Sequence, residues 1–180
     1  MWKKILLVAA AAVVLLVGAV ATRPSEYRVQ RSAVVAAPPD VAWAQVSDFG
    51  RWPPWSPWAR LDPAMKTTVA GAPGVPGHSY EWSGNKEVGK GKMTLTAATP
   101  GERVDIDLRF LEPWEGQSVT TFTFAPDGAG TRVTWTMSGK SNFAMKAMTL
   151  FVDMDKAIGK DFEKGLAALQ GVAAAEAARR

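Results

Sequence analysis

Few side chains in this sequence could carry acid–base chemistry. The only histidine, His78, is the first candidate, because an imidazole titrates near neutral pH. Tyr80 and Glu112 are the other two residues that could act as an acid or a base inside a cavity. No nucleophile with an orienting carboxylate is recognisable beside His78, and this favours an exposed loop histidine. The sequence therefore predicts no catalytic residue, and whether the protein is an enzyme stays open.

Metal and cofactor chemistry finds little support either. The chain has no cysteine, which excludes disulfides, thiolate catalysis and cysteine-ligated zinc or iron–sulfur sites. A single histidine also excludes histidine-rich metal sites. Asp105 and Asp107 look like a carboxylate pair, but they alternate with Ile106 and should therefore face solvent. We expect no metal and no cofactor.

The segment RWPPWSPWARLDPAM, residues 51–65, holds three of the eight tryptophans. Trp52, Trp55 and Trp58 are three residues apart, with prolines between them. Proline fixes φ and disfavours helical geometry for the residue before it, so an irregular or polyproline-like segment is expected. A polyproline helix has about three residues per turn and would align the indoles along one edge. That edge plugs the core, gates a cavity or dips into membrane headgroups.

The net charge of +4 is not spread over the chain. Three of the 21 basic residues, Lys3, Lys4 and Arg23, flank an N-terminal apolar run. The other 18 basic residues are balanced by 17 acidic residues, so the rest of the chain has a net charge of 18 − 17 = +1. Nucleic-acid-binding domains usually carry a concentrated basic surface. We therefore expect no nucleic-acid partner.

Residues 5–21 form an uncharged run of 17 residues, which is either a membrane anchor or a signal sequence. Ala19-Val20-Ala21 offers a cleavage site, and cleavage would leave a secreted or periplasmic protein. The length of the run instead favours a retained anchor. The lysines before it predict a single span with the domain on the extracytoplasmic side. Residues 22–27 then reach at most about 20 Å, which keeps the domain at the membrane surface.

The rest of the sequence predicts one α+β domain. Residues 27–35 alternate as a first strand, and a helix that begins near Pro38 and Pro39 ends at Gly50. From residue 78 onward, five segments alternate with period two between turns. This pattern indicates an antiparallel meander with one apolar face.

A C-terminal helix is expected to cover that face. Residues 143–170 carry apolar side chains at helical spacing and follow Asn142, a residue type typical of N-caps. Gly159 and Gly165 lie inside this helix and indicate close packing or a bend, because glycine lowers helix propensity.

The order of these elements, with four strings, resembles the SRPBCC superfamily, which includes START-type lipid-transfer domains and polyketide cyclase/dehydratase-like proteins. The resemblance implies a helix-grip fold, in which a curved antiparallel sheet wraps a long C-terminal helix and leaves a cavity for an apolar ligand. The chain then divides into an anchor or signal sequence at 1–23, a ligand-binding domain at 24–172 and a tail at 173–180. The strings are APPDVAWAQVSDFGRWPPWSPW at 37–58, YEWSGN at 80–85, VGKGKMTLT at 88–96 and GKDFEKGLAAL at 159–169.

The resemblance transfers no catalytic residue, because the superfamily has no fixed functional motif. It implies binding of a lipid or other hydrophobic small molecule in an internal cavity, and the N-terminal apolar run predicts that this binding domain is tethered to a membrane. One alternative is a cyclase/dehydratase-like enzyme acting on a hydrophobic substrate, and another is a module with a packed interior. In such relatives the inward face of the sheet, the loops at the mouth and the long helix contact the ligand. By position, the implied ligand-binding residues are Trp55, Trp58, Tyr80, Trp82, Met93, Phe110, Phe122, Trp135, Met154 and Ile158.

Overall fold

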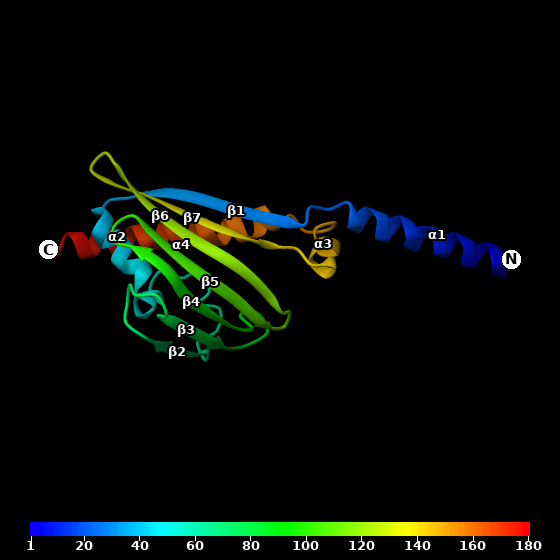
Figure 1. Cartoon of the computed structure of the whole chain (residues 1–180), viewed down its shortest axis with the longest axis horizontal. Helices are drawn as coiled ribbons and strands as arrows, with labels where there is room; N and C mark the ends of the chain where they lie inside the picture. The colour runs from blue at the N-terminus through cyan, green and yellow to red at the C-terminus, as the bar shows by residue number, and fades with distance from the viewer.

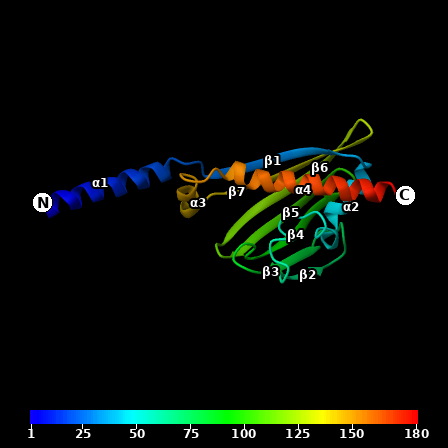
Figure 2. The same ribbon diagram turned by 180° about the vertical axis from the view of Figure 1, so that it is seen from behind.

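The computed structural model describes the whole chain, residues 1–180. Its elements are, in chain order, α1 (Trp2–Ala21), β1 (Glu26–Val35), α2 (Pro39–Ser47), the 3-10 turn η1 (Phe49–Arg51), β2 (Lys66–Ala70), β3 (Ser79–Ser83), β4 (Lys90–Thr99), β5 (Arg103–Glu112), β6 (Gly116–Asp127), β7 (Gly130–Lys140), α3 (Phe143–Met148) and α4 (Met154–Ala177). The seven strands form one antiparallel sheet in the order β1-β7-β6-β5-β4-β3-β2. The sheet curves around α4, and α1 projects from one end of the domain (Figures 1 and 2). The α+β helix-grip fold predicted from the sequence is confirmed.

The concave face of the sheet is apolar because side chains alternate between the two faces of each strand. On β7, Val133, Trp135 and Met137 point inward and are buried. Phe122 on β6 pairs with Trp135 across the ladder and is also buried. These side chains belong to one hydrophobic core that also includes residues of α2, η1 and α4.

The edge strand β2 is absent from the sequence prediction. All five of its residues, Lys66–Ala70, are exposed, so no alternation of buried and exposed positions marks it as a strand. It pairs with β3 through the register Lys66↔Ser83 to Ala70↔Ser79. Its place in the fold therefore depends on backbone pairing rather than on burial of an apolar face.

The single helix predicted over residues 143–170 is wrong, because the structure has two helices there. Asn142 does cap the first, accepting a hydrogen bond from the Met145 N–H at 2.8 Å. Asp153 caps the second, accepting from the Lys156 N–H at 3.1 Å, so the helix restarts after a five-residue break. Phe151 lies in this break and is 85% exposed rather than facing the sheet. At the other end, α4 continues to Ala177.

Glycine lets α4 approach the sheet closely, as the sequence predicts. A Cβ atom added at Gly165 would lie 2.8 Å from Cζ3 of Trp135 and 3.2 Å from Cδ of Pro57. A Cβ atom added at Gly159 would collide with the guanidinium of Arg31. Both glycines are buried, so their missing side chains set the distance between the helix and its neighbours.

Arg31 ties the first strand to the final helix. Its Nε donates to Glu163 at 2.8 Å, and its Nη2 donates to Asp155 at 3.0 Å. The hydrogen bonds to Asp155 and then to Glu163 raise the pKa of the Arg31 guanidinium above its usual range. This contact fixes the first half of α4 against β1.

The structure has one helix, α1, that is long and apolar enough to cross a membrane. Only Val20, near its C-terminal end, is buried. Four residues, 22–25, separate α1 from β1. A signal sequence near the N-terminus meets the same criteria of length and composition.

Replacing Gly165 by alanine is expected to destabilise the protein. Helix propensity alone would favour Ala by about 1 kcal/mol. The rigid rings of Trp135 and Pro57 leave no room for the added methyl, however, and overpacking of this kind costs about 1–3 kcal/mol. We expect the free energy of unfolding, measured by denaturant titration, to fall for Gly165→Ala.

Gly171→Ala is the matched control, because Gly171 lies in the same helix with nothing within 4 Å of an added Cβ. This variant should be more stable than the wild type by about 0.5–1 kcal/mol. An equal gain in both variants would show that α4 does not pack against Trp135 as described.

Candidate functional site

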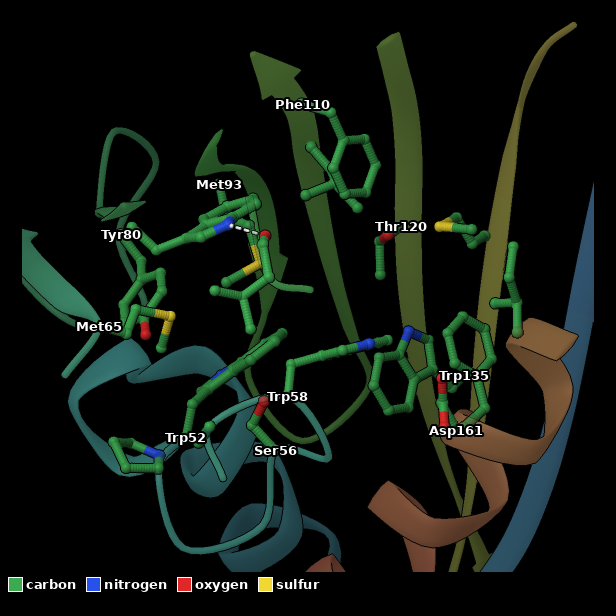
Figure 3. A pocket seen from close by; sticks show the side chains of 18 of the residues that line it. Trp52, Ser56, Trp58, Met65, Tyr80, Met93, Phe110, Thr120, Trp135 and Asp161 are labelled. Atoms are coloured by element: carbon green, nitrogen blue, oxygen red, sulfur yellow. Dashed lines mark hydrogen bonds between the residues drawn. The ribbon is translucent and has the colours of Figure 1, made fainter. Parts of the chain in front are cut away.

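A partly open cavity of about 250 Å³ lies between the concave face of the sheet, α4 and the tryptophan-rich segment, residues 51–65 (Figure 3). Fourteen of its 19 lining residues are hydrophobic. The lining residues are Trp52, Pro53, Ser56, Trp58, Ala59, Met65, Tyr80, Trp82, Glu87, Val88, Met93, Leu108, Phe110, Thr120, Trp135, Met137, Ile158, Asp161 and Phe162.

The cavity occupies the half of the domain that is nearer to α1. Leu108 and Phe110 lie near the end of β5, Met137 lies near the end of β7, and Ile158 lies in the second turn of α4. The packed core fills the other half, where later turns of α4 contribute Leu169 and Ala173. The two halves of the same sheet thus have different roles, since one is filled by side chains and the other is hollow.

The tryptophan-rich segment forms successive turns rather than the predicted polyproline-like stretch. The N–H groups of Trp55 and Ser56 both donate to the carbonyl of Trp52, at 3.0 and 2.8 Å. The prolines accommodate these turns because the hydrogen bonds use the N–H groups of other residues. Trp52 and Trp58 line the cavity, whereas Trp55 is 1% exposed and packs in the core. The segment therefore plugs the core and walls the cavity at the same time.

Aromatic contacts fix the walls. Trp135 stacks on Phe162 of α4 with ring centroids 4.1 Å apart and planes 7° from parallel. Trp58 meets Trp135 edge to face at 5.8 Å. Trp82 meets Phe110 edge to face at 6.1 Å, and its Nε1 donates to the Val88 carbonyl at 2.9 Å. Such contacts hold large rings in defined orientations, so the cavity has a fixed outline.

Seven of the ten residues expected to contact a ligand line the cavity, and their role in binding stays a prediction. The structure places the other three elsewhere. Trp55 and Phe122 are buried in the core behind the cavity wall. Met154 begins α4 and lines a surface depression beside Arg23 and Phe151. The seven are Trp58, Tyr80, Trp82, Met93, Phe110, Trp135 and Ile158.

Several lining residues were missed by the sequence reasoning. Leu108 and Met137 are two positions from the predicted Phe110 and Trp135, so strand alternation alone could have identified them. Phe162 is one helical turn after Ile158 and could have been found in the same way. Met65 and Val88 lie in loops, where no periodic pattern indicates the direction of a side chain.

Polar groups in the cavity wall are few. The ionisable lining residues are Tyr80, Glu87 and Asp161. Burial raises the pKa of the Tyr80 hydroxyl above its ordinary value. Asp161 forms an ion pair with Lys164 at 2.9 Å. The indole N–H of Trp135 is the one buried side-chain polar atom without a hydrogen-bond partner.

His78 is not the exposed loop residue that the sequence predicts, because its side chain is 1% exposed. Its Nε2 accepts from the Phe49 N–H at 3.0 Å, and its Nδ1 lies 3.0 Å from the Ala70 carbonyl. A nitrogen that accepts from N–H carries no proton, so the proton is on Nδ1 and is donated to the carbonyl. The imidazole also stacks on the Phe49 ring at 4.8 Å. It joins η1 to the end of β2 and does not line the cavity.

Glu112 and the carboxylate pair also lie outside the cavity. Glu112 ends β5, with a 69% exposed side chain 3.9 Å from the Lys90 ammonium. Asp105 and Asp107 are on the outer face, as predicted, and each pairs with an arginine at 2.7 Å. Partial burial by itself would raise the pKa of Asp105, but hydrogen bonds from Arg103 and Thr121 outweigh it and lower the pKa.

Comparison with known protein families shows which family the chain belongs to. The family model described as "Polyketide cyclase / dehydrase and lipid transport" matches residues 26–174. The chain belongs to this family. The resemblance to the SRPBCC superfamily stated from the sequence is confirmed, and the match covers every strand and most of α4.

Members of this fold among solved structures are distant in sequence. Protein CV1439 from Chromobacterium violaceum is 19% identical, with 84% of this chain and 98% of that chain covered and a TM-score of 0.59. Protein MLL2253 from Mesorhizobium loti is 18% identical, with 79% and 96% covered and a TM-score of 0.56. The Aha1 dimer from Colwellia psychrerythraea is 17% identical, with 80% and 93% covered and a TM-score of 0.57. These similarities show the fold alone. No curated protein sequence matches the chain.

Removing the His78 side chain is expected to destabilise the fold. His78→Leu leaves the buried Phe49 N–H without an acceptor, which costs about 1–3 kcal/mol. His78→Gln can still offer an acceptor and should lie between the wild type and the leucine variant. Denaturant titration checks this order, and a leucine variant as stable as the wild type would contradict the structural role.

The outer-face carboxylates predict a pH dependence of stability. Because the pKa values of Asp105 and Asp107 are lowered in the folded state, their contribution is complete above the unfolded pKa of about 4 and is lost as the pH falls through the folded pKa. Asp105→Asn should therefore be less stable than the wild type at pH 7, by about 1 kcal/mol. This difference should shrink as the pH falls below about 4, measured by urea denaturation. A difference that stays constant with pH would show that the carboxylate charge is irrelevant.

Proposed function

We propose that the protein binds a lipid or other hydrophobic small molecule in the cavity while α1 holds the domain at the extracytoplasmic surface of a membrane. The apolar lining of the cavity, with 14 hydrophobic residues of 19, is the observation that carries the proposal. The lipid-transport part of the family description agrees with it.

Burial of apolar surface supplies the energy for such binding. Each Å² removed from water contributes about 25 cal/mol, so about 200 Å² of ligand surface gives about 5 kcal/mol before the costs of association. Ordered aromatic walls reduce those costs, because rings held by Trp135–Phe162 and Trp82–Phe110 contacts do not have to be ordered by the ligand.

The size of the cavity constrains the ligand. Its 250 Å³ is below the range of about 300–1,000 Å³ for sites that enclose a drug-sized molecule. A ligand is therefore either small or leaves part of itself outside. Phe110 and Glu87 are exposed lining residues at the end of the domain toward α1, where a protruding part would emerge.

Three features support the membrane tether. The α1 helix is long and apolar enough to span a bilayer, and all of its residues except Val20 are exposed. Lys3 and Lys4 precede the apolar run, which favours a cytoplasmic N-terminus. The connection of residues 22–25 keeps the domain next to the helix.

Filling the cavity is expected to abolish ligand binding. Thr120 lines the cavity from β6 and is 3% exposed, so Thr120→Phe places a ring in the space that a ligand would occupy. Native mass spectrometry of the full chain, purified from its membrane in detergent, should show a lipid-mass adduct for the wild type and its loss for this variant.

Thr123→Phe is the control, because Thr123 is on the same strand with its side chain on the opposite face. This variant should keep the adduct. If folded Thr120→Phe retained the same adduct, the cavity would not be the binding site.

The enzyme alternative keeps one of its sequence-based candidates. Of the three acid–base candidates His78, Tyr80 and Glu112, only Tyr80 lines the cavity. A cyclase/dehydratase-like activity would use its hydroxyl on a bound hydrophobic substrate. Tyr80→Phe distinguishes the two functions, since a carrier keeps its adduct and an enzyme loses turnover while it still binds.

A further inference from the structure

Two groups of exposed apolar side chains stand out on the surface of the domain. One is the tip of the β5–β6 hairpin, where Trp114 is 76% exposed beside Leu111. The other is α3 and the break that follows it, where Phe143 and Phe151 are exposed. Large rings in such positions are unusual on a soluble surface, and clusters of them mark interaction sites.

Both groups lie at the same end of the domain. The register Glu26↔Lys140 places the start of β1 beside the end of β7, just before α3. The register Phe110↔Gly116 places the β5–β6 tip at this end as well. Figures 1 and 2 show α3 and the β5–β6 tip on the side of the domain from which α1 projects. We call this the α1 end.

We propose that the α1 end is a membrane-docking surface, in which the β5–β6 tip and the α3–α4 break insert into the same bilayer that α1 spans. This proposal rests on the proposed function, because it needs the membrane tether α1. It adds that the bilayer itself is the partner of the cavity opening. Phe110 lines the cavity and is itself exposed, and the next residue, Leu111, belongs to the apolar tip. Docking of the tip therefore places the cavity opening against lipid rather than water.

The side chains fit a bilayer better than a protein partner. Tryptophan is enriched at the membrane–water interface because its ring is apolar and its N–H is polar. A bilayer is already adjacent, since four residues connect α1 to the domain. Charges at the tip are mixed, with Lys90 lying 3.9 Å from Glu112, so the docking is apolar rather than an attraction to anionic lipid. Docking should therefore persist in neutral lipid and at high salt.

Single spin labels on the full chain can test this proposal directly, because the chain has no cysteine of its own. Trp114→Cys and Phe151→Cys report on the two groups. Ala129→Cys, in the turn between β6 and β7 at the opposite end, is the control (Figure 1). Leu15→Cys reports on α1 itself. Each labelled protein is reconstituted in phosphatidylcholine vesicles, and its collisions with oxygen and with a water-soluble nickel complex are measured.

We expect a shift from nickel-dominated collisions at position 129 to oxygen-dominated collisions at positions 114, 151 and 15. Labels at 114 and 151 that stay nickel-dominated would overturn the docking. Labels shielded from both probes, with spin–spin broadening that grows with the protein-to-lipid ratio, would assign the surface to a second copy and also overturn it. Leu111→Cys and Phe143→Cys repeat the test if either first variant fails to fold.

The outcomes separate docking from ligand binding. An adduct in detergent with labels at 114 and 151 in water leaves the carrier function standing and removes the docking surface. Labels at 114 and 151 in lipid, without any adduct in detergent, leave the docking surface standing and remove the carrier function. A label at 15 that stays in water removes the tether and, with it, the docking proposal.

Discussion

The stacked contact between Trp135 of β7 and Phe162 of α4 determines the interior of this domain. The two rings lie 4.1 Å apart, and Gly165, one turn later, leaves room for the Trp135 ring against the helix backbone. On one side of this contact, apolar side chains from α2, the strands and the later turns of α4 pack into the hydrophobic core. On the other side, Trp58, Trp82 and Phe110 line a space that no side chain fills, and the cavity remains.

The position of the cavity connects the fold to the proposed function. A long helix that closed onto the sheet along its whole length would leave a packed module, but α4 begins at Met154, after the chain has turned through a break. Arg31 then holds its first turns at a fixed distance from β1 through Asp155 and Glu163. The hollow half therefore faces α1, so a ligand that leaves a membrane at that end would have the shortest path to the cavity.

The sequence predicted those features of the fold that depend on the periodicity of strands and helices. Alternation identified the inward face of β4 to β7, and helical spacing identified the apolar face of the C-terminal helix. The resemblance to the SRPBCC superfamily then implied Met93, Trp135 and Ile158 as ligand contacts, and all three line the cavity. It implied Phe122 as well, but alternation gives only the face of a residue, and Phe122 is covered by its neighbours in the core.

Features that depend on tertiary contacts could not be predicted. His78 follows a loop rich in glycine and proline, and only the folded chain brings it to the Phe49 N–H and the Ala70 carbonyl. The break in the C-terminal helix depends on Asp153 acting as a cap, although apolar spacing continues through it. In the tryptophan-rich segment, Trp52 and Trp55 are held by indole hydrogen bonds to the carbonyls of Val46 and Gln45 in α2. No local pattern encodes those partners.

The central claim, that an apolar space remains between the sheet and the first half of α4, is tested most directly by a crystal structure of the protein under xenon pressure. Xenon binds in apolar cavities. The account predicts xenon density between Trp58, Trp82 and Phe110. An interior filled at that place by the protein's own side chains, with no xenon bound, would contradict it.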